Sequence, residues 1–198
     1  MALDVVSRAL DVSNALGALS REVARSVVLV RGSSGSAGSG VIWNAHRLVI
    51  TNHHVVPGAS AELVIAGVGR LGARVVGRAP GLDLAALEAL GDLPPGAEVG
   101  DSDDLRVGDL VVAVGNPMGE RNAPSVGILA SQPDEILRLA ITLRPGNSGG
   151  ALVNAHGQVV GIPHMVTGNG LALAVSTRTV RRFLAGAPEP AEADLRWV

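Results

Sequence analysis

The chain has 198 residues, of which 47% are apolar, 17% are charged and 2% are aromatic, and its formal net charge is −2. The apolar content suffices for a sizeable core and excludes a disordered chain, while the scarcity of aromatic residues requires a core of Val, Leu, Ile and Ala. No basic, aromatic-interleaved face of the kind that binds nucleic acid is present. Because the chain contains no cysteine, thiol catalysis, disulfides and cysteine-ligated metals are excluded.

Residues 1–26 are predicted to form a helical segment that packs on the body of the protein or on another subunit. Apolar side chains recur there at helical spacing, at Leu3, Val6, Leu10, Leu16, Leu19 and Val23. The N-terminus lacks a basic stretch followed by an apolar one, and no apolar run is long enough to span a membrane. These features predict a cytoplasmic protein. A sequence trimmed of an export signal would look the same, and its protein would be extracytoplasmic.

Residues 27–186 contain short runs rich in apolar and β-branched residues, separated by turn residues, which is typical of an all-β protein. The first six predicted strands are 27–30, 40–43, 48–51, 62–65, 73–76 and 84–87. The next six are 110–114, 125–129, 136–139, 151–153, 159–162 and 171–175. The pattern predicts two packed six-stranded antiparallel barrels, at about 27–93 and 110–176, joined by a linker at about 94–109. Thr177 is expected to cap a C-terminal helix over 177–185, and 187–198 is expected to be a mobile tail.

One serine lies in a turn built of small residues, Gly146-Asn147-Ser148-Gly149-Gly150. Glycines allow the backbone to direct neighbouring N–H groups into one concavity, so the turn from Gly146 through Asn147 to Ser148 is a candidate oxyanion hole, with the N–H groups of Gly146 and Ser148 as its donors. A serine hydroxyl becomes a nucleophile when an imidazole accepts its proton and a carboxylate orients that imidazole. Taken alone, this turn favours a catalytic serine over the alternative, a glycine-rich hairpin turn with an incidental serine.

A histidine and an aspartate that meet this need lie in the first strand series. His53 and His54 follow the predicted strand 48–51, and their side chains must diverge because they are adjacent. Asp83 stands at the head of an apolar strand, where its carboxylate needs a hydrogen-bonding partner such as an imidazole N–H. The order histidine, aspartate, serine, with the first two in one barrel and the third in the other, predicts an active site between the barrels.

Several segments together resemble the trypsin-like, chymotrypsin-fold serine proteases, and within them the HtrA/Deg family. They are Gly38-Ser39-Gly40-Val41-Ile42, Thr51-Asn52-His53-His54-Val55-Val56, Asp83-Leu84-Ala85, Val107-Gly108-Asp109, Gly115-Asn116-Pro117-Met118-Gly119 and Pro145-Gly146-Asn147-Ser148-Gly149-Gly150. The resemblance implies a triad of His54, Asp83 and Ser148, and it selects His54 because the family's catalytic histidine precedes Val-Val. It also implies ATP-independent cleavage of unfolded or exposed polypeptide through an acyl-enzyme, with no cofactor and no metal.

The resemblance also suggests how substrate is bound. Thr142 and Leu143 would line the base of the S1 pocket, and Ile162, Pro163 and His164 would form the edge strand that pairs with substrate. Because none of these residues is acidic, cleavage after small or medium aliphatic residues is expected rather than after Lys or Arg. Asn147 replaces the aspartate of digestive enzymes, so activation by N-terminal cleavage is not expected.

The chain departs from the family in two respects. It is too short to include the PDZ domain that usually follows the protease, and it lacks the aromatic residues through which many relatives trimerise, which leaves a homo-oligomer such as a trimer open. The alternative function is a peptide-binding or chaperone-like module with latent or weak protease activity. An esterase of the nucleophile-elbow type is disfavoured because no Gly-x-Ser-x-Gly turn lies between a predicted strand and a predicted helix, and because its triad order differs.

Overall fold

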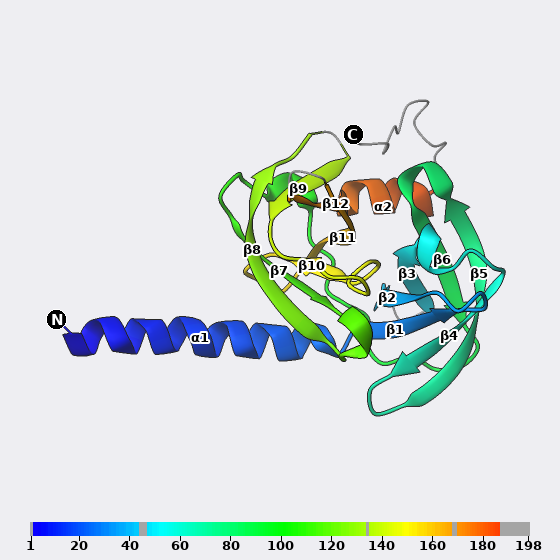
Figure 1. Ribbon diagram of the computed structural model, residues 1–198, viewed down its shortest axis with the longest axis horizontal. Coiled ribbons are helices and arrows are strands. Elements are labelled where there is room, and N and C mark those ends of the chain that lie inside the picture. Colours follow the sequence, from blue (N-terminus) through cyan, green and yellow to red (C-terminus); the bar gives the residue numbers. More distant parts are fainter. Residues whose placement is uncertain (1, 44–46, 134, 168–169, 187–198) are drawn as a thin grey trace.

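The computed structural model describes residues 2–43, 47–133, 135–167 and 170–186 of the chain. In these residues twelve strands form two closed antiparallel barrels that pack side by side, and a helix lies at each end (Figure 1). The predicted all-β architecture of two six-stranded barrels is confirmed. The predicted tail, 187–198, lies outside the described residues.

The first barrel has the strand order β1-β2-β3-β6-β5-β4. Short β-branched runs form its strands because such side chains pack well on a pleated surface. Two one-turn helices interrupt the barrel, η1 (His53–Val55) after β3 and η2 (Pro80–Leu82) before β6. Its strands are β1 (Val27–Gly32), β2 (Ala37–Ile42), β3 (Leu48–Asn52), β4 (Ser60–Ile65), β5 (Gly69–Ala79) and β6 (Leu84–Ala89).

The second barrel repeats this topology, since its order can be written β7-β8-β9-β12-β11-β10. Two further one-turn helices, η3 (Ser102–Asp104) and η4 (Pro117–Gly119), precede and follow β7. Its strands are β7 (Leu110–Gly115), β8 (Ala123–Ser131), β9 (Ile136–Ala140), β10 (Ala151–Val153), β11 (Val159–Val166) and β12 (Ala172–Ser176).

Three clusters of buried aliphatic side chains hold the two barrels. One fills barrel one, around Val30, Ile42 and Leu63, and a second fills barrel two, around Leu129, Leu139 and Leu152. The third joins the barrels and draws on both, as with Ile50 and Val114. Because this shared cluster fixes how the barrels sit against each other, it also fixes the distance between groups that they contribute to the site.

The N-terminal segment forms a single helix, α1 (Ala2–Ala24), which extends away from the barrels in Figure 1. Near its C-terminal end Leu16 and Leu19 pack on the shared core and Val23 is buried. In contrast, Val5, Val12 and their neighbours are exposed. No helix in the described part of the chain is long and apolar enough to cross a membrane.

The C-terminal helix, α2 (Thr177–Leu184), begins where it was predicted but is capped differently. The residue that caps it is Ser176, whose hydroxyl accepts the N–H of Thr179. The hydroxyl of Thr177 instead binds the backbone of residues 100 and 102. The prediction of Thr177 as the cap was therefore wrong by one residue, because its side chain serves a tertiary contact.

Candidate active site

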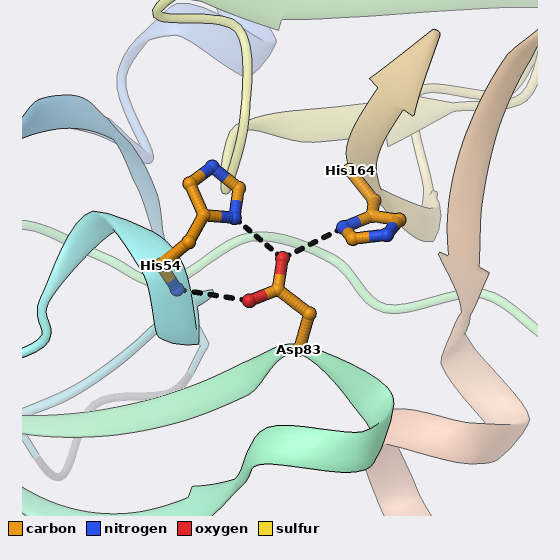
Figure 2. A group of neighbouring side chains, drawn as sticks. All are labelled: His54, Asp83 and His164. Atoms are coloured by element: carbon orange, nitrogen blue, oxygen red, sulfur yellow. Dashed lines mark hydrogen bonds and ion pairs between the residues drawn. The ribbon is translucent and has the colours of Figure 1, made fainter. Parts of the chain in front are cut away.

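The imidazole of His54 lies against the carboxylate of Asp83, and barrel one supplies both groups. Nδ1 of His54 is 2.6 Å from Oδ2 of Asp83, and the backbone N–H of His54 donates to Oδ1 at 2.8 Å (Figure 2). His54 is in η1, and Asp83 follows η2 in the left-handed conformation with φ 50°. An aspartate tolerates that conformation better than most residues do. The carboxylate thus holds the histidine by both its ring and its backbone.

The adjacent histidine, His53, has a different partner. Its Nδ1 accepts a hydrogen bond from the guanidinium of Arg78 at 2.8 Å, since an arginine can only donate. The same guanidinium donates to the carbonyl oxygens of Val56 and Gly58. The two rings therefore diverge: that of His54 contacts Asp83, and that of His53 contacts Arg78 of β5.

Asp83 is buried, and its surroundings favour the charged form. Burial raises the pKa of the carboxyl, but hydrogen bonds from the rings of His164 and His54, the charge of His54 and the His54 N–H together outweigh it. The net effect is to hold the pKa of Asp83 well below its usual range. Its main-chain oxygen is fixed as well, by the side-chain amide of Asn52 at 2.9 Å and by the N–H of His53. Asp83 is therefore an oriented anion at neutral pH.

Ser148 comes from barrel two, in the turn that leads into β10. Its backbone carbonyl accepts the N–H of Ser39, a residue of β2, at 2.8 Å, so this turn lies at the junction of the barrels. Its hydroxyl donates to the carbonyl oxygen of His164 at 3.1 Å. Among the described residues no hydrogen bond joins that hydroxyl to His54. The structure thus brings the three predicted triad residues to one region but gives the serine hydroxyl a main-chain partner.

The residues before Ser148 form a type II β-turn. The N–H of Asn147 donates to the carbonyl of Arg144 at 3.0 Å, with Pro145 and Gly146 between them, and Gly146 has φ 100°. A Cβ at Gly146 would lie 2.5 Å from the carbonyl oxygen of Asn116, so the turn requires glycine for its space as well as its φ.

This turn leaves two N–H groups available. The carbonyl of Pro145 accepts the N–H of Met118 at 3.0 Å, and in a trans peptide the following N–H, that of Gly146, points the opposite way. In the described part of the chain neither Gly146 nor Ser148 donates its N–H to a protein acceptor. The N–H of Asn147, the middle residue of the predicted oxyanion hole, instead donates to the carbonyl of Arg144.

The residues expected to bind substrate are distributed between surface and core. Thr142 is exposed and Leu143 is half-buried against the core of barrel two. Ile162 is fully buried in the shared core. The carbonyl of Pro163 accepts the N–H of Gly149, and the strand is paired with β12 on its other side.

His164 was predicted to lie on the edge strand that pairs with substrate, and the structure turns its ring inward. Its Nδ1 lies 2.7 Å from Oδ2 of Asp83, the oxygen that His54 also contacts, and the ring centroids of the two histidines are 6.2 Å apart. Sequence reasoning missed this contact because residues 83 and 164 lie in different barrels and no motif connects them.

The groups of His54, Asp83 and His164 are also of the kinds that ligate metals, and one ligand atom of each lies within 4.8 Å of the others. Both imidazoles, however, are at direct hydrogen-bond distance from the same carboxylate oxygen. The arrangement therefore has the form of a hydrogen-bonded His–Asp–His cluster.

Two closed six-stranded barrels, with a histidine–aspartate pair on one and a serine turn on the other, define the chymotrypsin-like class of serine proteases. The chain belongs to the trypsin-like peptidase family, since the family model described as a trypsin-like peptidase domain matches residues 38–162.

Similar proteins agree with this assignment and with the HtrA/Deg resemblance. A protein named as a serine protease, HhoA of Synechocystis, is 38% identical over 168 residues, which are 75% of this chain and 43% of that protein. A DegP-like periplasmic serine endoprotease of Chlamydia trachomatis is 34% identical over 144 residues, 67% of this chain and 29% of the relative. The chain thus spans less than half the length of these relatives.

A solved structure with the same fold is that of the HtrA-type protease AlgW with tripeptide. It has a TM-score of 0.79 and 28% sequence identity, and the match covers 85% of this chain and 62% of that one.

Proposed function

We propose that this chain is a serine endopeptidase in which Ser148 is the nucleophile, His54 the general base and Asp83 the carboxylate that orients His54. The observation that carries the proposal is the double contact of Asp83 with the ring and the backbone of His54. Because the ionised carboxylate accepts from Nδ1, the proton of a neutral His54 is on that nitrogen. Nε2 is then the atom that takes the proton of Ser148.

Ser148 would attack the carbonyl carbon of the scissile peptide to give a tetrahedral intermediate, and His54 would then return the proton to the leaving amine. The acyl-enzyme that remains is hydrolysed by water in the same manner. The N–H groups of Gly146 and Ser148 would stabilise the oxyanion, and the type II turn supports this because it directs them away from internal acceptors. For attack to begin, the serine hydroxyl must leave the carbonyl of His164.

The proposed substrates are unfolded or exposed polypeptides, cut after small or medium aliphatic residues. Thr142 and Leu143 precede the serine turn and carry no acidic group that could pair with Lys or Arg. Extended substrate would bind beside Pro163 and His164, on the side of β11 that lies past its last pair with β10 at Gly161. A peptide library in which cleavage after Arg or Lys dominates would refute this preference.

The test of the activity compares the protein with its Ser148→Ala variant on an unfolded protein substrate, with the products mapped by mass spectrometry. We expect the unsubstituted protein to cut within the chain and the variant to be slower by a factor of about 10⁴ or more. Removal of residues from the chain ends only would exclude an endopeptidase.

A second candidate function is a peptide-binding or chaperone-like module with latent activity. The observation that favours it is the bond of Ser148 Oγ to a main-chain carbonyl rather than to His54. This candidate predicts that the unsubstituted protein and Ser148→Ala suppress aggregation of an unfolded protein equally well, with no cleavage of that protein in either sample.

Two further proposals concern the cellular compartment and the oligomeric state of the protein. The cytoplasmic prediction from the N-terminal sequence stays a prediction, and a relative named as a periplasmic enzyme favours the extracytoplasmic alternative. Fractionation of the producing cells decides between them. A homo-oligomer, with the trimer as one form, is tested by light scattering.

A further inference from the structure

A second imidazole contacts the carboxylate of the proposed triad, and it comes from the opposite barrel. His164 is in β11 of barrel two, and its Nδ1 lies 2.7 Å from Oδ2 of Asp83, a distance close to the 2.6 Å for His54. The two rings approach the carboxylate from its two sides (Figure 2). Only 8% of the His164 side chain is exposed, compared with 51% for His54.

A β-bulge explains why the ring is turned inward. Pro163 pairs with Ala174 and Met165 pairs with Leu173, so the neighbours of His164 pair with consecutive residues of β12 and His164 is the extra residue between them. A bulge of this kind breaks the alternation of side chains and can re-aim one of them. The fold thus uses an irregularity of β11 to place a polar ring at the junction of the barrels.

The contact with Asp83 is the polar anchor of this ring. Nε2 of His164 is buried and has no hydrogen-bond partner among the residues that the structure describes. Because the anionic Asp83 can only accept a hydrogen bond, a neutral His164 carries its proton on Nδ1 and donates it to Asp83. Its Nε2 is then an acceptor without a donor. The ring is therefore oriented toward the carboxylate and toward no other described group.

We propose that His164 is a positioning residue of the active site, which fixes the carboxylate of Asp83 in the orientation that holds His54. This inference rests on the proposed function. With both rings in place, Oδ1 binds the His54 N–H and Oδ2 binds two ring N–H groups. Without His164, the buried carboxylate loses one donor and the restraint on its rotation, and His54 alone receives the charge of Oδ2.

Two variants separate the donor from the ring. His164→Asn keeps an N–H donor close to the position of Nδ1 and removes the titratable ring, while His164→Leu has a similar volume and no donor. Both keep the main-chain carbonyl that binds the hydroxyl of Ser148. Any difference between them therefore reports on the bond to Asp83.

We expect His164→Leu to lower kcat by about 10-fold with little change in KM, and His164→Asn to stay within about threefold of the unsubstituted protein.

The titratable groups that the described structure places at the ring are Asp83 and His54. In His164→Leu the acid limb of kcat/KM should move to higher pH, because His54 faces the carboxylate alone and holds its proton more tightly. Full kcat in His164→Leu, equal losses in both variants, or a lower kcat with an unshifted acid limb would overturn the proposal.

A measurement on the unsubstituted protein decides the matter even where a variant does not fold. Nitrogen-15 NMR of the imidazoles should find the proton of neutral His164 on Nδ1, and a proton on Nε2 would contradict the bond to Asp83. Labelling of Ser148 by a fluorophosphonate, run alongside, tests the proposed function separately. A protein that is not labelled but carries the proton on Nδ1 fails as a protease and still has the contact.

Discussion

The hydroxyl of Ser39 donates to the carbonyl oxygen of Gly146 at 2.7 Å, and this contact joins β2 of barrel one to the turn that carries the proposed oxyanion donors. The same hydroxyl accepts the backbone N–H of Asn116 at 2.8 Å and lies 3.2 Å from its side-chain amide. Ser39 is fully buried. One side chain of the first barrel therefore holds two loops of the second.

Ser39→Ala should lower kcat without destroying the fold. The substitution leaves the partly buried carbonyl of Gly146 and the buried N–H of Asn116 without this partner, which costs about 1–3 kcal/mol of folding stability. Because Gly146 precedes the nucleophile by two residues, we expect kcat to fall about 10-fold or more. Urea unfolding and steady-state kinetics measure the two effects. The control is Ser34→Ala, an exposed serine of the preceding turn, and equal effects of the two substitutions would contradict the role of Ser39.

The two adjacent histidines give a matched pair of variants. His54→Ala removes the proposed base and should slow cleavage by about 10⁴-fold or more, as loss of a triad member does. His53→Ala removes the acceptor of one Arg78 hydrogen bond and should affect stability while leaving kcat within a few-fold. Comparable kinetic losses in both variants would contradict the assignment of His54.

The depressed pKa of Asp83 makes a prediction about stability and pH. An unfolded aspartate titrates near pH 3.9, and the folded pKa lies below this. The stabilising contribution is therefore complete above about pH 4 and is lost as the pH falls toward the folded pKa. Asp83→Asn, which cannot titrate there, should be less stable by about 1–2 kcal/mol at pH 7, and the difference should shrink below about pH 4. Urea unfolding of both proteins from pH 7 to pH 3 measures it, and a pH-independent difference would exclude the linkage.

Helix α1 offers an internal comparison between two valines. Val23 is 5% exposed and belongs to the shared core, whereas Val12, nearer the N-terminus of the same helix, is 60% exposed. Val23→Ala should cost about 2 kcal/mol through lost burial and a residual cavity, and Val12→Ala should cost less than about 0.5 kcal/mol. Thermal unfolding of the two variants at one protein concentration tests this. A large cost at Val12 would instead indicate that its end of the helix is covered in solution.

Much of the fold was predictable because each strand carries its own signal. Runs such as residues 110–114 are apolar and β-branched, and glycines and prolines separate them, so both the number of strands and their division into two barrels could be predicted. The cap of α2 was placed one residue late, since Ser176 and Thr177 have equivalent hydroxyls and only tertiary contacts distinguish them.

The site was predictable only where a local motif marks it. Ser148 lies among glycines, and the two histidines follow a strand, but the choice of His54 over His53 depended on the family resemblance. The ring of His164 could not be placed, because a bulge in β11 reverses the expected alternation and its partner is in the other barrel. The role of Ser39 depends likewise on contacts across the barrel junction.

The most direct test of the proposed triad is to label its nucleophile covalently. The protein is treated with a fluorophosphonate in its native state and after unfolding, and the modified residue is mapped by mass spectrometry of its peptides. The proposed mechanism predicts one adduct, on Ser148, that forms only in the native protein and is lost in Ser148→Ala and strongly slowed in His54→Ala. A native protein that forms no adduct, or an adduct on another serine, would contradict it.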